Sequence, residues 1–426
     1  MTDQPDNPED SQETISFFDR PGVQVQILPV GPGVPLGIEQ VSSPSLGIGG
    51  AYGAWGESYD NDSLPGLVEH RLGEPLSEAD RLDLSPLGFD RRHHITELSE
   101  EEHYQVEVQV GAHVLRAAAQ ACGWEPGEVD AVMIGLSGPI TEDYTEQIAR
   151  AAGVPEEALK VSIHKACDGS VGALHLALNP DLPAQRMVGH NIAEELYGKK
   201  VLVGGIEGLS RFVRLSRDKN AMQLFGNGAG VIGVIPGLTM KFLVGKTHEV
   251  FDDEGVLAVR MYYPHSRHKE EGVSMVEVTQ PGEHHIRLAG LMHEPDDASP
   301  VVMAGPMGMV KLFVRSGVDV VRDVYAAYQA CLNELGMAGK QIATAVVHHA
   351  NLKINRLKEK HLQKEGIVLP MPWVIKEFGN VSAASNMIAF LRQLPGLRPG
   401  DHVLFDGFGA GTYYDVLAVV LAGPVA

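Results

Sequence analysis

The stretch HKACDGSVGALHLAL, residues 164–178, holds one of only three cysteines in a chain of 426 residues. The β-type run LKVSI precedes it at residues 159–163, and the small, apolar run VGALHLAL at residues 171–178 is typical of a buried helix. Cys167 is therefore predicted to lie between a strand and a helix. The positive end of a helix dipole lowers the pKa of a thiol and favours the nucleophilic thiolate. The alternative is an inert buried cysteine, as most free cysteines are.

An internal repeat extends outward from this stretch. VDAVMIGLSGP (129–139) matches IATAVVHHAN (342–351), and the cysteine stretch matches PWVIKEFGNVSAASNMIAFL (372–391). KVLVGGIEGLS (200–210), continued by LFGNGAGVIGVI (224–235), matches HVLFDGFGAGTYYDVLAVVL (402–421). Strands alternate with helices from about Glu100 onward, which is typical of an α/β protein. The order of the matches predicts two similar halves that bring corresponding loops together.

The repeat and the local composition predict the domain organisation. Residues 1–20 are acidic and polar, which predicts a disordered tail. The N-terminal half then covers residues 21–237 and includes a long irregular region at 40–90, rich in Gly, Pro and Ser, whose role is left open. The C-terminal half covers residues 238–426, with a loop-rich excursion at 243–278.

The composition excludes several classes of protein. The chain carries 34 Lys and Arg against 55 Asp and Glu, a formal net charge of −21. This balance argues against a general binder of nucleic acid or of anionic membranes, because both require positive surface charge. The three cysteines are far apart and form no CxxC pair, so neither disulfides nor a zinc site are predicted. The run DVLAVVLAGPVA (415–426) is too short to span a bilayer and predicts a buried strand. We expect a cytoplasmic protein.

Stacking of the two halves would bring three loops together. They carry Cys167, HHAN (348–351) and FGNVSAAS (378–385), which supply a thiol, an imidazole and a carboxamide. These groups predict a cysteine-based acyl-transfer site. A single one of 18 histidines is weak support, and Asn380 is alternatively a turn residue. Alternation along the strand predicts that His349 points away from His348. The glycine-rich runs FGNGAG and GFGAG predict close-approach turns.

Five stretches, in order, resemble the thiolase superfamily and within it the β-ketoacyl-ACP synthase III (KAS III) branch: KACDGSVGAL, FGNGAG, HHANLKI, GNVSAAS and GFGAG. The resemblance runs from about Gly88 to the C-terminus. It implies a thiolase-like fold, in which two βαβαβ-type halves form a layered α-β-α-β-α sandwich. It also implies that Cys167 is the nucleophile, with His348 and Asn380 as its partners. The backbone N–H groups of Cys167 and Ala410 would form the oxyanion hole.

The resemblance further implies the reaction. An acyl-cysteine would undergo decarboxylative condensation with a malonyl-type thioester, in fatty-acid or secondary-metabolite biosynthesis. We expect acyl-CoA or acyl carrier protein (ACP) as substrates, a homodimer, and no metal or redox cofactor. Two alternatives are an acyltransferase or thioester hydrolase without decarboxylation, and a non-catalytic subunit of a synthase.

The chain departs from the family pattern mainly around the substrate entrance. LDLSPLG (82–88) stands where a CoA-binding Trp and Arg are expected, and Lys219 stands in place of a phosphate-binding Arg. Ala410 replaces a glycine, and Tyr414-Asp415 replaces an aromatic-Gly pair. An acidic ACP would need a basic surface, for which KINRLKEKHLQK (353–364), including Lys353, Arg356, Lys358 and Lys360, is the candidate. The alternative is an ordinary solvated helix face.

Overall fold

The computed structural model describes residues 17–18, 20, 22–137, 141–214, 216–250, 259–261, 276–290, 301–303, 306–410 and 412–423. Its larger sheet has the strand order β1-β2-β3-β9-β8-β6-β7-β13-β12, and a second sheet has the order β10-β17-β16-β15. The strands of the larger sheet are β1 (Gln26–Val30), β2 (Val34–Ser43), β3 (Ile48–Trp55), β9 (Gly228–Val234), β8 (Val201–Glu207), β6 (Ala131–Gly135), β7 (Leu159–His164), β13 (His285–Gly290) and β12 (Val276–Gly282). Those of the second sheet are β10 (Met240–Glu249), β17 (Tyr413–Leu421), β16 (His402–Gly409) and β15 (Ile342–Val347).

The two sheets repeat one strand pattern. In the first half, β3 pairs antiparallel with β9, β9 antiparallel with β8, and β8 parallel with β6. In the second half, β10 pairs antiparallel with β17, β17 antiparallel with β16, and β16 parallel with β15. The correspondence of β6 with β15, and of β8 and β9 with β16 and β17, is the one that the internal repeat predicts.

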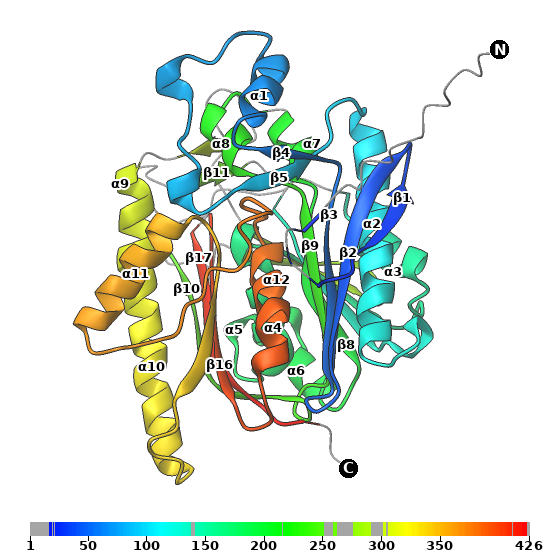
Figure 1. Ribbon diagram of the computed structural model, residues 1–426. Helices are drawn as coiled ribbons and strands as arrows, with labels where there is room; N and C mark the ends of the chain where they lie inside the picture. The colour runs from blue at the N-terminus through cyan, green and yellow to red at the C-terminus, as the bar shows by residue number, and fades with distance from the viewer. Residues whose placement is uncertain are drawn as a thin grey trace, which may run out of the picture.

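Helices and sheets alternate in five layers (Figure 1). α4 (Gly169–Leu178) and α12 (Ala384–Gln393) lie between the two sheets, and both are buried along their whole length except for residues 392 and 393. α2 (Glu100–Ala121) and α3 (Tyr144–Ala152) cover the outer face of the larger sheet. α10 (Gly317–Glu334) and α11 (Leu352–Lys364) lie outside the second sheet. The predicted layered sandwich is confirmed.

The remaining α-helices are short. They are α1 (Leu64–Leu72), α5 (Pro183–Val188), α6 (Ile192–Glu195), α7 (Leu209–Arg214), α8 (Lys219–Leu224) and α9 (Pro306–Met309). β4 (Glu57–Asp60) pairs with β5 (Arg91–His94), and β11 (Val259–Met261) pairs with β14 (Val301–Met303). Within the described residues, no helix combines the length and the apolar character needed to cross a membrane.

The region 40–90 is more regular than the sequence predicts. Residues 40–60 complete β2 and form β3 and β4, and α1 follows. Strand propensity does not predict β3, because its sequence, IGGAYGAW, is rich in glycine. Those glycines are required by close packing: a Cβ on Gly49 would lie 2.5 Å from the carbonyl oxygen of Ala121, and one on Gly50 would lie 2.7 Å from Leu391. Packing space, rather than strand propensity, selects the residues of this strand.

Two further boundaries differ from prediction. The expected loop-rich excursion at 243–278 contains most of β10 and the start of β12, while residues 251–258 and 262–275 lie outside the described residues. In the predicted N-terminal tail, Phe17 and Phe18 are buried against the core. Residues 1–16 lie outside the described residues. Arg20 forms an ion pair with Glu39 at 3.1 Å. The predicted tail therefore extends too far into the chain.

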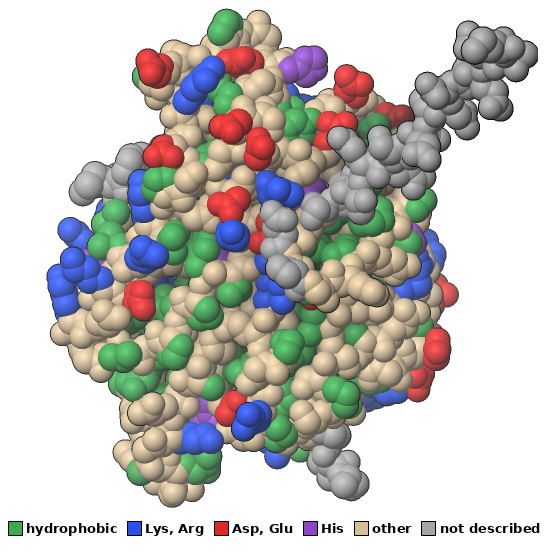
Figure 2. Space-filling model, viewed as in Figure 1, with side chains coloured by type: hydrophobic (Ala, Val, Ile, Leu, Met, Phe, Trp, Pro, Cys, Tyr) green, Lys and Arg blue, Asp and Glu red, His purple; other side chains and the backbone are tan. Residues whose placement is uncertain are grey.

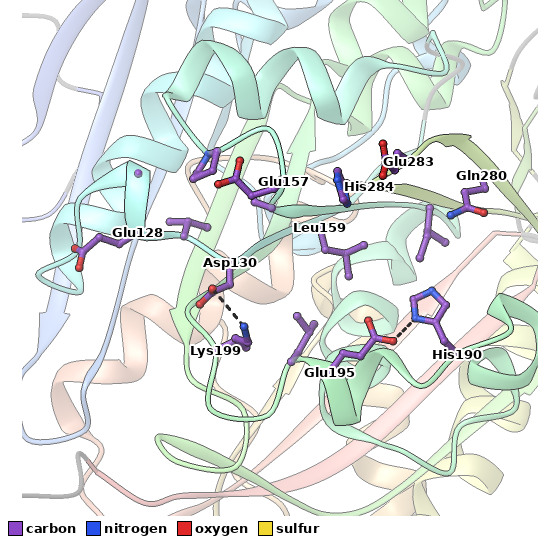
Figure 3. Close-up of a pocket in the computed structure, with 16 residues that line it drawn as sticks. Glu128, Asp130, Glu157, Leu159, His190, Glu195, Lys199, Gln280, Glu283 and His284 are labelled. Carbon is purple, nitrogen blue, oxygen red and sulfur yellow. Dashed lines mark hydrogen bonds and ion pairs between the residues drawn. The ribbon is translucent and has the colours of Figure 1, made fainter.

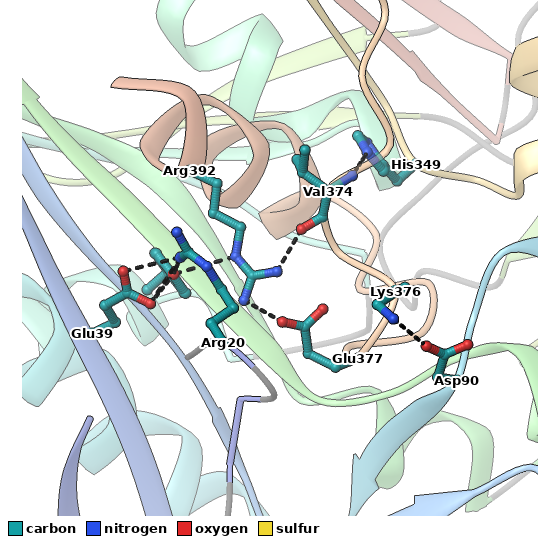
Figure 4. Close-up of polar contacts among 9 residues, drawn as sticks. Arg20, Glu39, Asp90, His349, Val374, Lys376, Glu377 and Arg392 are labelled. Carbon is teal, nitrogen blue, oxygen red and sulfur yellow. Dashed lines mark hydrogen bonds and ion pairs between the residues drawn. The ribbon is translucent and has the colours of Figure 1, made fainter. Parts of the chain in front are cut away.

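The segment before Asn380 is also not the strand that the repeat predicts. Residues 370–379 form an extended loop that is held by side chains (Figure 4). Arg392 on α12 forms an ion pair with Glu377 at 2.6 Å and donates a hydrogen bond to the carbonyl of Val374. Lys376 forms an ion pair with Asp90 at 2.8 Å. These side-chain contacts hold the loop together with backbone hydrogen bonds, among them the one from the Asp90 N–H to the Lys376 carbonyl at 2.8 Å.

Candidate active site

The two backbone positions with unusual dihedrals meet at Cys167. Ala166 and Ser382 are the only described non-glycine residues with positive φ, at 49° and 45°. Ala166 begins the tight turn Ala166–Asp168 that links β7 to α4, and Cys167 lies at the centre of this turn. The Ser382 hydroxyl donates to the Cys167 Sγ at 3.1 Å. Left-handed non-glycine residues are costly and cluster at functional sites, so both strained turns point to this thiol.

The resting thiol is not activated in the way that the sequence predicts. Cys167 does lie at the start of a helix, but its side chain is buried and its residue is only 7% exposed. Burial raises the pKa of the Cys167 thiol to about 12, although the Ser382 hydrogen bond opposes the rise. This rise outweighs the lowering of the pKa that is expected from the helix dipole, because the free-energy cost of removing a thiolate from water exceeds its stabilisation by the helix end.

The glycine-rich end of β16 packs directly against the cysteine turn. A Cβ on Gly409 would lie 2.7 Å from the Asp168 nitrogen and 3.0 Å from the Cys167 nitrogen. Ala410 follows at once and shares an apolar cluster with Ala166. The predicted close-approach turn is confirmed, and the structure brings Ala410 beside the cysteine turn. The FGNGAG glycines are equally confined, since a Cβ on Gly226 would lie 2.7 Å from the carbonyl oxygen of Phe378.

His348 follows β15 and is buried. Its Nδ1 lies 2.6 Å from the Ser385 Oγ, which leaves Nε2 for another contact. Burial lowers the pKa of His348 to about 3, so the ring is neutral at neutral pH. His349 points elsewhere, as alternation predicts: its Nδ1 bonds to the Val347 carbonyl and its Nε2 accepts from the Val374 N–H.

Asn380 joins the loops of the cysteine and the histidine. Its Oδ1 accepts a hydrogen bond from the Ser382 N–H at 2.9 Å, and its Nδ2 donates to the Ala350 carbonyl at 3.3 Å. Ser382 in turn contacts Cys167. The structure therefore brings the three predicted residues into one hydrogen-bonded assembly. In the described part of the chain, Ser382 and Ala350 link the loops, and no hydrogen bond joins the three side chains directly.

Sequence reasoning missed a carboxylate behind this assembly. Glu207 at the end of β8 is buried and accepts hydrogen bonds from the Ser137 hydroxyl at 2.7 Å and from the Ala383 N–H at 3.1 Å. The Ser137 hydroxyl also contacts that of Ser382. Burial raises the pKa of Glu207 to about 8. The available signal was an acidic residue inside the apolar run KVLVGGIEGLS.

A second buried polar cluster explains the departure at Asp415. Lys165, two residues before Cys167, forms an ion pair with Asp415 at 2.5 Å, and the His175 Nδ1 lies 2.6 Å from the other carboxylate oxygen. Burial raises the pKa of Asp415, but Lys165 and His175 outweigh this effect and hold the pKa below its usual range. Burial and the nearby Asp415 raise the pKa of Asp168 well above its usual value. Asp415 is thus the counter-ion of a lysine that packs beside the cysteine turn.

The segment between β3 and β5 covers the site. Apolar residues of α1 and the following turns pack in one cluster with Ala166 of the cysteine turn, with Ala410 and with residues in and after α7 and α8. The cluster includes Leu64, Leu67, Val68, Leu76, Leu84, Ala166, Phe212, Met222, Phe225 and Ala410. In Figure 1 this segment lies at the top, above the ends of the central strands. The sequence left the role of residues 40–87 open; the part from residue 57 onward forms a cap over the candidate site.

The predicted substrate-binding cations differ in their surroundings. Lys219 begins α8 and is already paired, with Asp80 at 2.9 Å and Glu74 at 3.7 Å. Lys353 and Arg356 are exposed on α11, as a docking surface requires. Lys358 is not part of that surface: it is fully buried and forms an ion pair with Asp406 at 2.5 Å. The helical period turns this lysine inward, and the paired carboxylate on β16 makes its burial tolerable.

A separate surface pocket of about 540 Å³ lies at the opposite ends of the strands (Figure 3). Asp130 precedes β6 and Leu159 begins β7, whereas Ser137 and Cys167 follow those strands. Five carboxylates, two histidines and one lysine line it: Glu128, Asp130, Glu157, Glu195, Glu283, His190, His284 and Lys199. Among the described residues, no cluster of His, Cys, Asp or Glu is placed to hold a metal ion. This pocket takes no part in the cysteine site.

Comparisons with known proteins agree with this geometry. Residues 332–421 match the family model described as 3-oxoacyl-[acyl-carrier-protein (ACP)] synthase III C terminal. The chain is 24% identical to a β-ketoacyl-[acyl-carrier-protein] synthase III of Brucella suis over 326 residues, which are 74% of this chain and 84% of that protein.

Solved structures have the same fold. The 3-oxoacyl-[acyl-carrier-protein] synthase III of Aquifex aeolicus matches with a TM-score of 0.57 and 18% identity, over 93% of this chain and 100% of that one. The 1,3,6,8-tetrahydroxynaphthalene synthase of Streptomyces coelicolor, a bacterial type III polyketide synthase, matches with a TM-score of 0.58 and 13% identity, over 94% and 99%. The predicted resemblance is therefore confirmed: the chain has the thiolase-like fold of the KAS III and type III polyketide synthases, and its C-terminal part matches the KAS III family model.

Proposed function

We propose that the protein is a decarboxylating condensing enzyme, an acyltransferase of the β-ketoacyl-ACP synthase III type. One observation carries the proposal: the loops of Cys167, His348 and Asn380 form a single buried hydrogen-bonded assembly at a strained turn. The relatives named above, which are ketoacyl and polyketide synthases by their names, support the same class. No residue in this assembly requires a metal or redox cofactor for the proposed reaction.

In the first half of the reaction, the Cys167 sulfur attacks the carbonyl of an acyl thioester. The carbonyl oxygen becomes an oxyanion, which the backbone N–H groups of Cys167 and Ala410 stabilise. One such donor typically contributes about 3 kcal/mol. The close packing of Gly409 on the cysteine turn supports this pairing, because Ala410 directly follows Gly409 in the chain. The products of this half are acyl-Cys167 and a free thiol.

In the second half, a malonyl-type thioester loses CO₂ and leaves an enolate. The His348 Nε2–H and the second N–H of the Asn380 amide donate to the enolate oxygen, and the carbanion then attacks acyl-Cys167. For this role Nε2 must carry the proton, and in that tautomer Nδ1 accepts a hydrogen bond from the Ser385 hydroxyl, which lies 2.6 Å away. The low pKa of His348 keeps it a neutral donor, which stabilises the enolate without protonating it.

We propose acyl-ACP or acyl-CoA as the acyl donor, with α11 as the ACP docking surface. Lys353, Arg356 and Lys360 are exposed on this helix, and Figure 2 shows Lys and Arg side chains gathered over it. α11 directly follows the His348 loop, so a carrier bound there would lie close to the site. Lys219 remains a weaker candidate, because Asp80 and Glu74 already neutralise it.

Intact-protein mass spectrometry after incubation with a panel of acyl-CoAs and acyl-ACPs tests the proposal. We expect one acyl group on the native protein and none on Cys167→Ala, with Cys331→Ala as the matched control that keeps the adduct. Release of labelled CO₂ from a malonyl thioester then separates condensation from simple acyl transfer or hydrolysis. An acylated protein that releases no CO₂ would contradict the condensing reaction, and a native protein that no thioester acylates would contradict both.

A further inference from the structure

A chain of buried hydroxyl groups connects the nucleophile to a carboxylate. The Cys167 Sγ contacts the Ser382 Oγ at 3.1 Å, the Ser382 and Ser137 hydroxyls contact each other, and the Ser137 Oγ donates to the Glu207 Oε1 at 2.7 Å. All four residues are buried, with exposed fractions of 7% or less. They come from the cysteine turn, the loop after Asn380, the end of β6 and the end of β8, so only the folded chain assembles them.

We propose that this chain is the proton path of the nucleophile: Glu207 takes the Cys167 proton through Ser382 and Ser137, and returns it when the acyl-cysteine is consumed. Only the return of the proton rests on the proposed function, because it requires an acyl-cysteine that is consumed; the removal of the thiol proton does not. Glu207 does not touch the reacting atoms, so it acts through the two hydroxyls. Its part is to set the protonation state in which the sulfur attacks.

The geometry explains why the proton goes to Glu207 and not to His348. The Nδ1 of His348 is bonded to Ser385, and the proposed enolate donor needs a proton on Nε2, so the ring has no free lone pair for the thiol proton. The pKa of His348, about 3, also makes it a much weaker base than Glu207, whose pKa is about 8. The Glu207 carboxylate is held ready by the Ala383 N–H at 3.1 Å and the Ser137 N–H at 3.2 Å.

The proton balance closes over one catalytic cycle. In the structure the Ser382 hydroxyl donates to the Cys167 Sγ, so it must first turn to donate to Ser137. When sulfur attacks, the thiol proton then moves to Ser382, the Ser382 proton to Ser137, and the Ser137 proton to Glu207. A sulfur–carbon bond forms to the acyl group, and the donor leaves as a thiolate that takes a proton from solvent. When the carbanion attacks acyl-Cys167, this bond breaks and the sulfur leaves as a thiolate. The proton on Glu207 then returns along the same hydroxyls, which restores the Cys167 thiol and the ionised Glu207.

Other titratable groups face Glu207 from the surrounding elements. Across a small cavity of about 10 Å³, which is room for about one water molecule, lie Glu107 of α2, Tyr144 of α3 and Arg211 of α7. Glu107 and Arg211 form a buried ion pair at 2.9 Å, and the Tyr144 hydroxyl lies 3.4 Å from Glu107. This pair is close to neutral as a unit, and Tyr144 is uncharged because burial raises its pKa well above the ordinary value. Of these groups, Glu207 is the one that accepts a hydrogen bond from the Ser137 hydroxyl.

The alkylation rate of Cys167 by iodoacetamide tests the relay without any thioester. It is measured from pH 6 to 10 by mass spectrometry of the Cys167 peptide, which separates it from Cys122 and Cys331. For the native protein we expect the rate to rise to a plateau above about pH 8, where Glu207 is ionised. For Glu207→Gln we expect a rate about 10- to 100-fold lower at pH 8.5 that rises tenfold per pH unit without a plateau, because hydroxide is then the only base.

Conservative variants separate the relay from a structural role. Glu207→Asp should recover part of the plateau, and Ser137→Ala should lose it while leaving Glu207 in place. Ser170→Ala is the matched control: Ser170 is a buried serine that donates to the Ala383 carbonyl in the same loop but lies outside the hydroxyl chain. It should keep the native plateau. A native-like plateau in both Glu207→Gln and Ser137→Ala would overturn the relay. Absence of acylation or of CO₂ release would overturn the proposed function instead, and would leave the alkylation result standing.

Discussion

Burial decides the chemistry of the single residues at this site. The sequence identifies Cys167, His348 and Asn380 by their motifs, and the fold brings their loops together. It does not predict their protonation states, because these depend on how much water surrounds each group in the folded protein. The thiol of Cys167 is a weaker acid than its helix position suggests, and His348 is a weaker base than an ordinary histidine.

The hydroxyl of Ser385 is expected to control the tautomer of His348. Ser385→Ala removes the hydroxyl at Nδ1, so the ring is free to carry its proton on the wrong nitrogen. We expect the condensation rate, measured as CO₂ release, to fall about 10- to 100-fold while the rate of acylation by acyl-CoA stays within about twofold. Ser170→Ala, on α4, serves as the control for removal of a buried hydroxyl. Equal losses in both rates would show that Ser385 does not act through the histidine.

At the scale of elements, α11 divides its basic residues between the surface and the core. Lys353 and Arg356 are exposed, whereas Lys358 points inward to Asp406 on β16 and lies above the Phe408 ring at 4.8 Å. The charge run KINRLKEKHLQK is therefore two features, a surface and a buried ion pair. The folded helix separates the two features by placing these residues on different faces.

The surface half of α11 is tested with charge reversal. The double variant Lys353→Glu/Arg356→Glu should raise the KM for acyl-ACP by about tenfold and leave the KM for acyl-CoA unchanged, because only the carrier protein reaches this surface. Lys364→Glu, at the far end of the helix, is the matched control. Steady-state kinetics with both donors make the comparison, and an equal change with acyl-CoA would point to a damaged site instead of a lost docking surface.

The buried half is tested by stability. Lys358→Ala leaves the Asp406 carboxylate buried without its cation, and breaking such a pair typically costs 3–5 kcal/mol of unfolding free energy, so we expect a loss of about that size in urea titrations. Burial already raises the pKa of Asp406 against the effect of Lys358. Protonation of Asp406 should therefore reduce the loss of unfolding free energy in the variant, which we expect to be smaller at pH 5 than at pH 8. Lys353→Ala, five residues earlier and exposed, should change stability by less than about 0.5 kcal/mol.

For the whole molecule, Glu207 links the site to the pH dependence of folding. Its pKa is about 8 when folded, against an ordinary value of 4.5, so the folded state binds more protons between these values. The unfolding free energy contributed by Glu207 therefore falls as the pH rises from about 4.5 to 8. Compared with Glu207→Gln, the native protein should lose a few kcal/mol over this window, on the order of 1.4 kcal/mol per pH unit of displacement. Urea titrations of both proteins at pH 5 and 8.5 measure it; parallel curves would contradict the raised pKa.

The homodimer implied by the resemblance also belongs to this scale and stays a prediction. The hairpin β12–β13 of the C-terminal half pairs with β7 of the N-terminal half, so the chain itself occupies that edge of the larger sheet. A second copy would have to meet another surface or the outer edge of β12. Light scattering after size-exclusion chromatography gives the oligomeric state directly.

The sequence by itself determined the α/β class, the repeat, the resemblance and the three residues of the proposed site, because each depends on local patterns and on motifs with fixed spacing. It did not determine β3, whose glycines reflect packing space, or the ordered position of Phe17 and Phe18. It also missed Glu207, because an acidic residue in an apolar strand gains meaning only from what surrounds it. The tertiary structure decided the protonation of Cys167 and His348, the inward turn of Lys358 and the hydroxyl chain to Glu207. The physical reason is the same in each case: burial and contacts between distant segments exist only after the two halves have packed together.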